Sequence, residues 1–324
     1  MTTDEARTHI ETRLGHSLEE LLRYPKFVDL DTVNQCNARC IMCGIDFSKR
    51  RRRVMADELF ERITAELANH ADDVERVGLE VNCEPLLDPA LEDRIARLKQ
   101  AGIRRTFIST NGSLLSTDRS RRLLDAGLDI TYISIDSLHK ETFERIRRGL
   151  RFDEVYRNTL EFIRLKHEIR PSGTVRIFMV LQQDNRDEAE AFVEHWESRL
   201  GPGDEVVVSY AYDWGNAPSV SLPVSEDEPD DTPCISLWSS LVIAVNGDVH
   251  LCCYDADGET ILGNVGRSRI ADLWQCRALQ AIREQHLSGR RRDRPLCARC
   301  NVWHHAKHAI RRRIGDPSSV SGSR

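Results

Sequence analysis

Three cysteines near the amino end have a spacing that suits iron chemistry. Cys36, Cys40 and Cys43 stand in the run Cys-Asn-Ala-Arg-Cys-Ile-Met-Cys. Thiolates on so short a loop can bind three irons of a four-iron cube and leave the fourth iron open to a small molecule. A structural zinc ion is the alternative, but zinc in such sites normally takes four protein ligands.

Polar residues follow three of the predicted strands further along the chain. They are Glu84-Pro85, then Thr110-Asn111-Gly112, then Ser134 with Asp136. Each short pattern is weak alone, because a Glu-Pro after a strand is most often only a turn. In this order behind the three cysteines, they resemble the radical S-adenosylmethionine (SAM) superfamily.

The resemblance assigns roles to these residues. It implies that the three cysteines hold a [4Fe–4S] cluster whose open iron binds SAM. The Glu of the family's Gly-Gly-Glu-Pro motif contacts the SAM amino group, which points to Glu84, although Asn82 and Cys83 replace the two glycines. The remaining cofactor-binding candidates are Pro85, Thr110, Asn111, Ser134, Asp136 and Arg147.

The chemistry of the superfamily follows from the same resemblance. A reduced cluster passes an electron to the sulfonium of SAM, and the resulting 5′-deoxyadenosyl radical removes hydrogen from an unactivated C–H bond. The protein orients the reactants and excludes water. An external electron donor of the flavodoxin or ferredoxin type is therefore an expected partner, besides a small-molecule substrate.

A second set of cysteines lies in the carboxyl-terminal part. Cys234, Cys252 and the pair Cys297-Ala-Arg-Cys300 resemble the "twitch" domain, the short form of the SPASM extension. The resemblance implies one auxiliary [4Fe–4S] cluster with these four ligands. Zinc at a four-cysteine site is the alternative.

Three of the ten cysteines are left over: Cys83, Cys253 and Cys276. A free cysteine is usually a small hydrophobic residue. The other interpretation is a catalytic hydrogen donor, which quenches a substrate radical and inverts a stereocentre. Without such a donor, the radical loses a proton and an electron and an alcohol becomes a ketone.

Hydrophobic periodicity predicts alternating strands and helices through the first two thirds of the chain. The predicted strands are Phe27–Val33, Val77–Val81, Thr106–Ser109, Ile130–Ile135, Val175–Leu181 and Val206–Tyr210. The predicted helices between them include Met55–Leu67, Pro89–Gln100, Asp118–Asp125, Lys140–Arg148, Phe152–His167 and Glu188–Leu200. This alternation indicates an α/β fold, a partial (β/α)6 barrel with its active residues at the carboxyl ends of the strands.

The domain plan has five parts. They are a helical lead-in over 1–26, the radical SAM barrel over 27–214, a linker over 215–233, a twitch/SPASM domain over 234–310 and a disordered tail over 311–324. Within the fourth part we expect a hairpin over Val242–Leu251, turning at Asn246-Gly247, and a helix over Ile270–His286.

Composition excludes several functional classes. The 324 residues contain no apolar run long enough to span a membrane and no signal-peptide core at the amino end. A cytoplasmic, reducing setting is expected, where clustered cysteines favour metal over disulfides. The net charge of −6 argues against nucleic acid as a general partner. The basic run Lys49–Arg53 is a local exception, read as a solvated helix lead-in or as a contact for an acidic substrate group.

Together these features favour an enzyme that dehydrogenates or epimerises a small polar metabolite: a sugar, an aminocyclitol or a nucleoside. Natural-product (antibiotic) biosynthesis is the expected setting. A maturase of a ribosomally synthesised peptide is the alternative, although only 35 residues precede Cys36, too few for the usual peptide-recognition domain. A metal-stabilised binding module without catalysis is a third, weaker interpretation.

Overall fold

The computed structural model describes residues 1–211, 231–298, 300, 302 and 309–315. Its main sheet is continuous and runs in the order β11-β10-β9-β1-β3-β4-β5-β7-β8-β12. Six neighbouring strands are parallel and form the barrel part: β1 (Phe27–Leu30), β3 (Arg76–Gly78), β4 (Thr106–Thr110), β5 (Ile130–Ser134), β7 (Thr174–Leu181) and β8 (Glu205–Tyr210). The predicted partial (β/α)6 barrel is confirmed.

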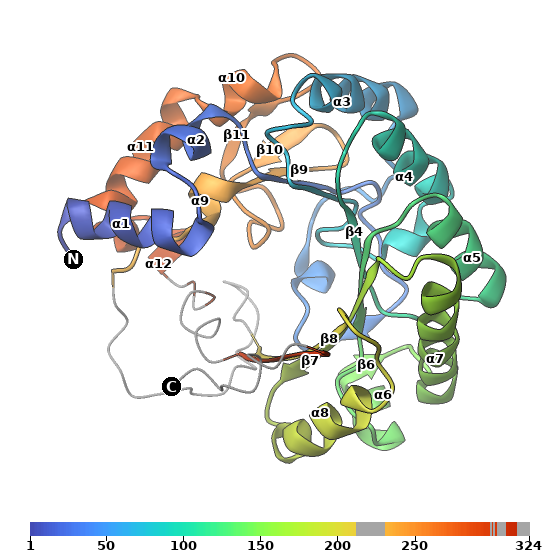
Figure 1. Ribbon diagram of the computed structural model, residues 1–324. Helices are drawn as coiled ribbons and strands as arrows, with labels where there is room; N and C mark the ends of the chain where they lie inside the picture. The colour runs from blue at the N-terminus through green and yellow to red at the C-terminus, as the bar shows by residue number, and fades with distance from the viewer. Residues whose placement is uncertain (212–230, 299, 301, 303–308, 316–324) are drawn as a thin grey trace.

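Helices line the outside of the curled sheet (Figure 1). They are α3 (Asp57–Asn69), α4 (Leu91–Gln100), α5 (Thr117–Asp125), α6 (Lys140–Ile146), α7 (Phe152–Ile169) and α8 (Ala189–Glu197). Each turns an apolar stripe inward, as α3 does with Phe60, Ile63 and Leu67. Strand β7 alternates residue by residue between buried and partly exposed side chains, so one face packs on the helices and the other lines the barrel interior.

The cluster loop carries a small second sheet. Strand β2 (Arg39–Cys40) pairs antiparallel with β6 (Arg147–Arg148). The predicted helix over Lys140–Arg148 is therefore wrong at its end, because α6 stops at Ile146. Pairing with a distant segment decides the conformation of these two arginines, which local helix propensity cannot foresee.

The amino-terminal lead-in is helical, in two pieces, α1 (Thr3–Leu14) and α2 (Leu18–Arg23). Capping boxes at Thr2 and Ser17 start both helices. The indole nitrogen of Trp274 donates a hydrogen bond of 2.9 Å to the carbonyl of Leu21, so the lead-in packs against the carboxyl-terminal part.

The carboxyl-terminal part extends the same sheet. Strand β9 (Ser240–Ile243) lies parallel to β1, and β10 (Asp248–His250) and β11 (Ile261–Asn264) follow antiparallel. The predicted turn is present, with Gly247 at a φ of 87° that disfavours other residues. The expected hairpin is confirmed, because β9 and β10 pair antiparallel, and a third strand, β11, pairs with β10.

The predicted helix over Ile270–His286 is two helices, α10 (Ile270–Trp274) and α11 (Arg277–Leu287). Short helices complete this part: α9 (Ser236–Ser239), α12 (Pro295–Ala298) and the 3-10 turn η4 (Arg291–Asp293). The barrel part contains three further 3-10 turns, η1 (Gly44–Phe47), η2 (Pro85–Leu87) and η3 (Arg186–Glu188). In the described ranges, no helix is both long and apolar enough to cross a bilayer.

The expected disordered tail from Arg311 onward is wrong at its start. Strand β12 (Ile310–Arg313) pairs antiparallel with β8, and the amide of Ile314 donates a bond of 2.9 Å to the carbonyl of Asp204. Charged side chains suit an exposed sheet edge, which explains why this basic segment forms a strand. Residues 316–324 and most of the expected linker, 215–230, lie outside the described residues.

Candidate active site

The cluster loop brings its three cysteines together behind β1. Cys40 lies on β2, directly opposite Arg147 on β6, and the amide of Cys43 donates to the carbonyl of Cys40 at 3.1 Å. The Sγ of Cys36 accepts the amide of Ala38 at 3.4 Å. Burial raises the pKa of the Cys36 thiol and raises that of Cys40 to about 12. Such thiols ionise only beside strong positive charge, which iron supplies.

Arg147 is the fixed cation of this site. Its Nη1 lies 3.8 Å from the Sγ of Cys40, and its Nε donates to Asp136 Oδ2 at 2.7 Å. Asp136 is fully buried, and its other oxygen accepts the amide of Val180 at 2.8 Å. The carboxylate of Asp136 therefore positions Arg147. Ser134 ends β5 half-buried, and its place near SAM or substrate stays a prediction.

Glu84 anchors the ends of β3 and β4. Its carboxylate accepts hydrogen bonds from Thr110 Oγ1 at 2.6 Å, the amide of Asn111 at 2.8 Å and the amide of Leu86 at 3.2 Å. Burial nevertheless raises the pKa of Glu84, and the hydrogen bonds oppose that effect. Pro85 begins η2 and is buried. The direct contact of Glu84 with SAM stays a prediction.

Asn111 connects this anchor to the cluster loop. Its Nδ2 lies 2.8 Å from Asn37 Oδ1 and 3.9 Å from the Sγ of Cys36. Thr110 is buried, and its hydroxyl donates a hydrogen bond to Glu84. Five of the residues predicted around SAM are thus connected with the cysteine loop: Glu84, Thr110, Asn111, Asp136 and Arg147.

Sequence reasoning missed three carboxylates of the barrel interior: Asp29, Asp31 and Glu80. Asp29 lies 3.3 Å from Arg76, and Asp31 Oδ2 lies 2.7 Å from Arg50. Gly78 makes room for this, because a Cβ there would lie 2.4 Å from Asp29 Oδ1. The signal was present in the sequence, since charged residues inside an otherwise apolar parallel strand rarely face the helices.

Glu80 has no ion pair or hydrogen bond of its side chain within the part of the chain that the structure describes. Burial raises its pKa well above that of an ordinary carboxyl, and Asp29 and Asp31 add to the effect while Arg76 opposes it. The barrel interior therefore offers a polar, acid-rich floor.

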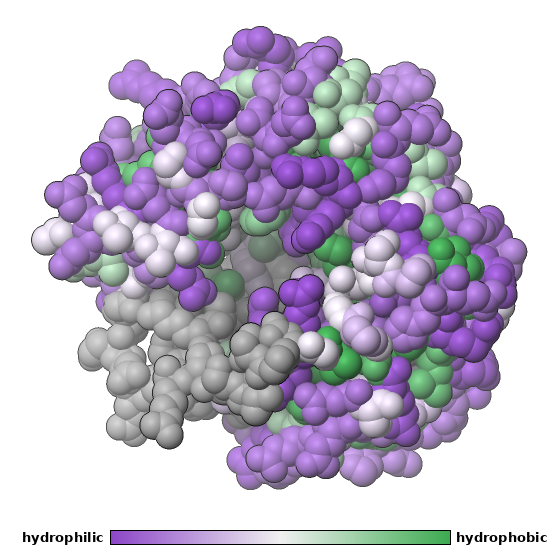
Figure 2. All heavy atoms as spheres, in the orientation of Figure 1, coloured by the Kyte–Doolittle hydropathy of each residue, from purple (hydrophilic) through white to green (hydrophobic). Residues whose placement is uncertain are grey.

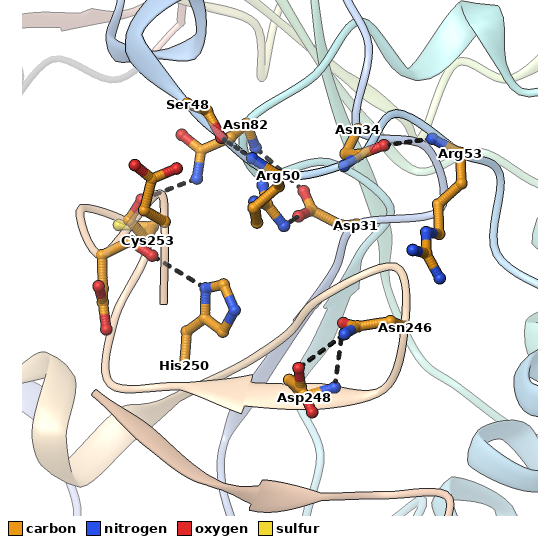
Figure 3. Close-up of polar contacts among 12 residues, drawn as sticks. Asp31, Asn34, Ser48, Arg50, Arg53, Asn82, Asn246, Asp248, His250 and Cys253 are labelled. Atoms are coloured by element: carbon orange, nitrogen blue, oxygen red, sulfur yellow. Dashed lines mark hydrogen bonds and ion pairs between the residues drawn. The ribbon is translucent and has the colours of Figure 1, made fainter. Parts of the chain in front are cut away.

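The three spare cysteines lie in two different places. Cys253 is exposed and follows β10, and its carbonyl accepts Asn82 Nδ2 at 3.1 Å (Figure 3). The amide of Asn82 donates to Asp31 at 3.1 Å. Cys253, which is bonded to Asn82, and Cys83, which follows Asn82 in the sequence, therefore both lie beside the interior carboxylates. Cys276 caps α11 on the outer side of the molecule and packs against the core (Figure 1).

Cys253 is an exposed residue, yet other protein groups lie close around its thiol. Desolvation by surrounding protein raises its pKa, and Asp29 and Glu80 raise it further. Figure 2 shows a hollow near the centre of the face that it draws. Cys253 lies in the loop that follows β10, which ends at His250.

The second cysteine set converges as well. Cys234, Cys252, Cys297 and Cys300 line one pocket together with apolar side chains of Leu237, Leu251 and Leu296. The amide of Cys234 donates to Nδ1 of His286 at 3.2 Å, which fixes the loop before α9. Burial raises the pKa of Cys297 to about 12, that of Cys300 to about 11 and that of Cys252 further.

The donor sets fit iron–sulfur clusters better than single ions. Among the residues that are described, no group of three His, Cys, Asp or Glu side chains is arranged to hold one metal ion. A four-iron cube spreads its ligands further apart, since each thiolate binds a different iron. Both cysteine sets supply the soft, anionic sulfur donors that such clusters require.

Comparison with known proteins agrees with this geometry. Residues 30–195 match the radical SAM superfamily, and residues 234–301 match an iron–sulfur cluster-binding domain, SPASM. The first match covers half of the chain, and the chain belongs to the radical SAM superfamily. It is an enzyme that uses a SAM-binding [4Fe–4S] cluster, SAM and auxiliary iron–sulfur chemistry in its second domain, as predicted.

Curated relatives cover only part of the chain. It is 30% identical over 170 residues to GTP 3′,8-cyclase of Chlorobaculum tepidum, which is 52% of this chain and 49% of that protein. Over 140 residues it is 32% identical to GTP 3′,8-cyclase of Limosilactobacillus fermentum, with 41% and 40% covered. The chain thus spans about half or less of the curated relatives that it matches.

Solved structures share the fold over more of the chain. A structure of BtrN in complex with AdoMet and 2-DOIA superposes with a TM-score of 0.58 at 18% identity, covering 86% of this chain and 93% of that one. Streptococcus suis SuiB bound to its precursor peptide SuiA gives 0.64 at 15% identity, covering 81% and 67%. These likenesses establish the fold, not the substrate.

Proposed function

We propose that this enzyme removes hydrogen from a small polar metabolite, a sugar, an aminocyclitol or a nucleoside, and epimerises or dehydrogenates it. The observation that carries the proposal is the place of Cys253, an exposed residue bonded through its carbonyl to Asn82, beside the carboxylates of the barrel interior. Hydroxyl and amino groups of such a metabolite match carboxylate acceptors. A nucleoside is the member of this class that the names of the curated relatives favour.

When bound, the SAM-loaded cluster supplies the radical that abstracts hydrogen from the substrate. The protein residues then decide the outcome. Cys253 donates a hydrogen atom: its S–H bond breaks, a C–H bond forms on the substrate carbon, and a thiyl radical remains. One electron and one proton, the electron from the external donor, restore the thiol. If no thiol reaches the carbon, the substrate radical would lose a proton and pass one electron to the auxiliary cluster that Cys234, Cys252, Cys297 and Cys300 would hold, and the alcohol would become a ketone.

The other cofactor assignments belong to the same proposal. One auxiliary [4Fe–4S] cluster is held by Cys234, Cys252, Cys297 and Cys300, whose thiols share a single pocket. A network of contacts fixes the residues that we assign to SAM binding. In it, Glu84, Thr110 and Asn111 are joined to Cys36, and Arg147 is joined to Cys40.

The experiment is product analysis in D₂O with SAM, a reductant and candidate substrates. Deuterium at a carbinol carbon marks epimerisation, and a carbonyl marks oxidation. We expect Cys253→Ala to divert an epimerase toward the ketone, because the hydrogen donor is gone. Cys276→Ala is the matched control, because Cys276 stands at the start of α11 and packs against the hydrophobic core. Equal product ratios in wild type, Cys253→Ala and Cys83→Ala would remove the donor role from both cysteines.

A further inference from the structure

The segment Lys49–Arg53, which links the cluster loop to α3, carries an unusual concentration of exposed charge. Arg51, Arg52 and Arg53 are all exposed, and none of the three forms an ion pair within the described chain. Arg50 differs, because it turns inward to Asp31 and is paired there (Figure 3). The whole chain has a net charge of −6, so this positive surface is a local reversal of sign.

The backbone under these side chains is held in place. Asn34 donates to the carbonyl of Arg51 at 2.9 Å and accepts the amide of Arg53 at 2.6 Å. The amide of Lys49 donates to Asp257 at 2.9 Å, which ties the segment to the carboxyl-terminal domain. A positively charged surface is therefore presented at a fixed place rather than on a free loop.

That place is next to the first cysteine site. A crevice lined by Gln35, Cys36, Arg39, Ser48 and Arg52 joins the exposed arginines to the thiol-bearing loop. A neighbouring crevice contains Arg51 and Arg53. Asp248 and Asp257, which line that second crevice, already accept hydrogen bonds from Asn264 and from the amide of Lys49. Arg148, which is exposed and has no ion pair among the residues that the structure describes, lies opposite Arg39 across the β2–β6 pair.

We propose that the surface formed by Arg51, Arg52, Arg53 and Arg148 is the docking site for an acidic one-electron carrier protein that reduces the enzyme. The inference rests on the proposed function, which needs electrons one at a time. A flavodoxin-type donor in its hydroquinone state gives up one electron and becomes the semiquinone, while the enzyme gains that electron. Complementary charge accelerates and orients such encounters without a large interface.

Nucleic acid is the competing partner for an arginine run. Single-stranded nucleic-acid sites combine basic grooves with aromatic side chains on which bases stack. No aromatic residue lies in Lys49–Met55, and no Phe, Tyr or Trp lines either crevice, although His250 lines the second. The adjacent thiol site favours an electron carrier.

The test measures binding and reduction with an acidic bacterial flavodoxin as the probe. Reconstituted full-length protein carrying Arg51→Glu and Arg52→Glu is compared with wild type and with Arg7→Glu/Arg157→Glu, two exposed arginines on α1 and α7. We expect the patch variant to bind flavodoxin about tenfold or more weakly at low salt and to lose the salt dependence of reduction. Arg51→Lys/Arg52→Lys keeps both charges and is expected to bind like wild type.

A chemical reductant separates this inference from the proposed function. With photoreduced deazaflavin and no substrate, the patch variant and wild type are expected to form 5′-deoxyadenosine at the same rate. If neither forms it, the radical chemistry itself fails while the flavodoxin titration still reports on docking. Unchanged flavodoxin affinity in the patch variant overturns the proposal, as does loss of oligonucleotide binding with flavodoxin binding intact.

Discussion

Single residues in the mouth of the barrel take roles that their sequence positions only partly suggest. Asp136 was expected to face SAM or substrate, yet its two oxygens are used by Arg147 and by the amide of Val180. Motif position predicted that these residues matter at this site. It did not predict that a buried ion pair holds the cation beside Cys40, because the partner, Arg147, comes from a different segment.

This ion pair should be costly to break. In Asp136→Ala the guanidinium of Arg147 stays buried without its counter-charge, which typically costs about 3–5 kcal/mol. We therefore expect a large fall in the thermal unfolding midpoint of the reconstituted protein. Asp153→Ala breaks the exposed pair with Lys140 and is the matched control, expected to leave the midpoint nearly unchanged. Equal midpoints for the two variants would show that the pair is unimportant.

At the scale of elements, the local sequence pattern determines some helices and strands, and pairing with distant segments determines others. The six parallel strands and their helices could be predicted, because each has its own hydrophobic period. Strands β2, β6 and β12 could not, since they are short and their stability comes from partners far away in the chain. The pairing of β9 with β1, which makes the sheet continuous, could not be predicted from the local pattern either.

The β12 pairing gives an element-scale prediction. Ile314→Pro removes the amide that donates to Asp204 and leaves that carbonyl without its partner, at a cost of about 1–3 kcal/mol. A lower unfolding midpoint is expected, together with faster hydrogen exchange along β8. Ile314→Val keeps the amide and nearly the same side chain. If proline and valine have the same effect, the strand does not stabilise the sheet edge.

The whole molecule concentrates charge inside its barrel, and stability should therefore depend on pH. The folded chain raises the pKa of Glu80, so it holds a proton that the unfolded chain has already released near the ordinary carboxyl pKa. Stability from this group is consequently lost as pH rises through the folded pKa. The groups around it act as stated above: Asp29 and Asp31 raise the pKa, and Arg76 lowers it.

Glu80→Gln removes this dependence because an amide does not ionise. Relative to wild type, the variant is expected to be more stable at pH 8 than at pH 5, because only the wild type must ionise a buried carboxyl as the pH rises. Thermal unfolding midpoints at equal ionic strength measure the difference. Glu58→Gln, exposed on α3, serves as the control. The same offset for Glu80→Gln at both pH values would contradict the burial effect.

The most direct measurement of the central claim is the release of 5′-deoxyadenosine from SAM by the anaerobically reconstituted full chain under a strong reductant. Cys36, Cys40 and Cys43 are held together beside Arg147, and the account predicts release by wild type and by Cys276→Ser. It predicts none from Cys40→Ser. No release from wild type, or equal release from wild type and Cys40→Ser, would contradict it.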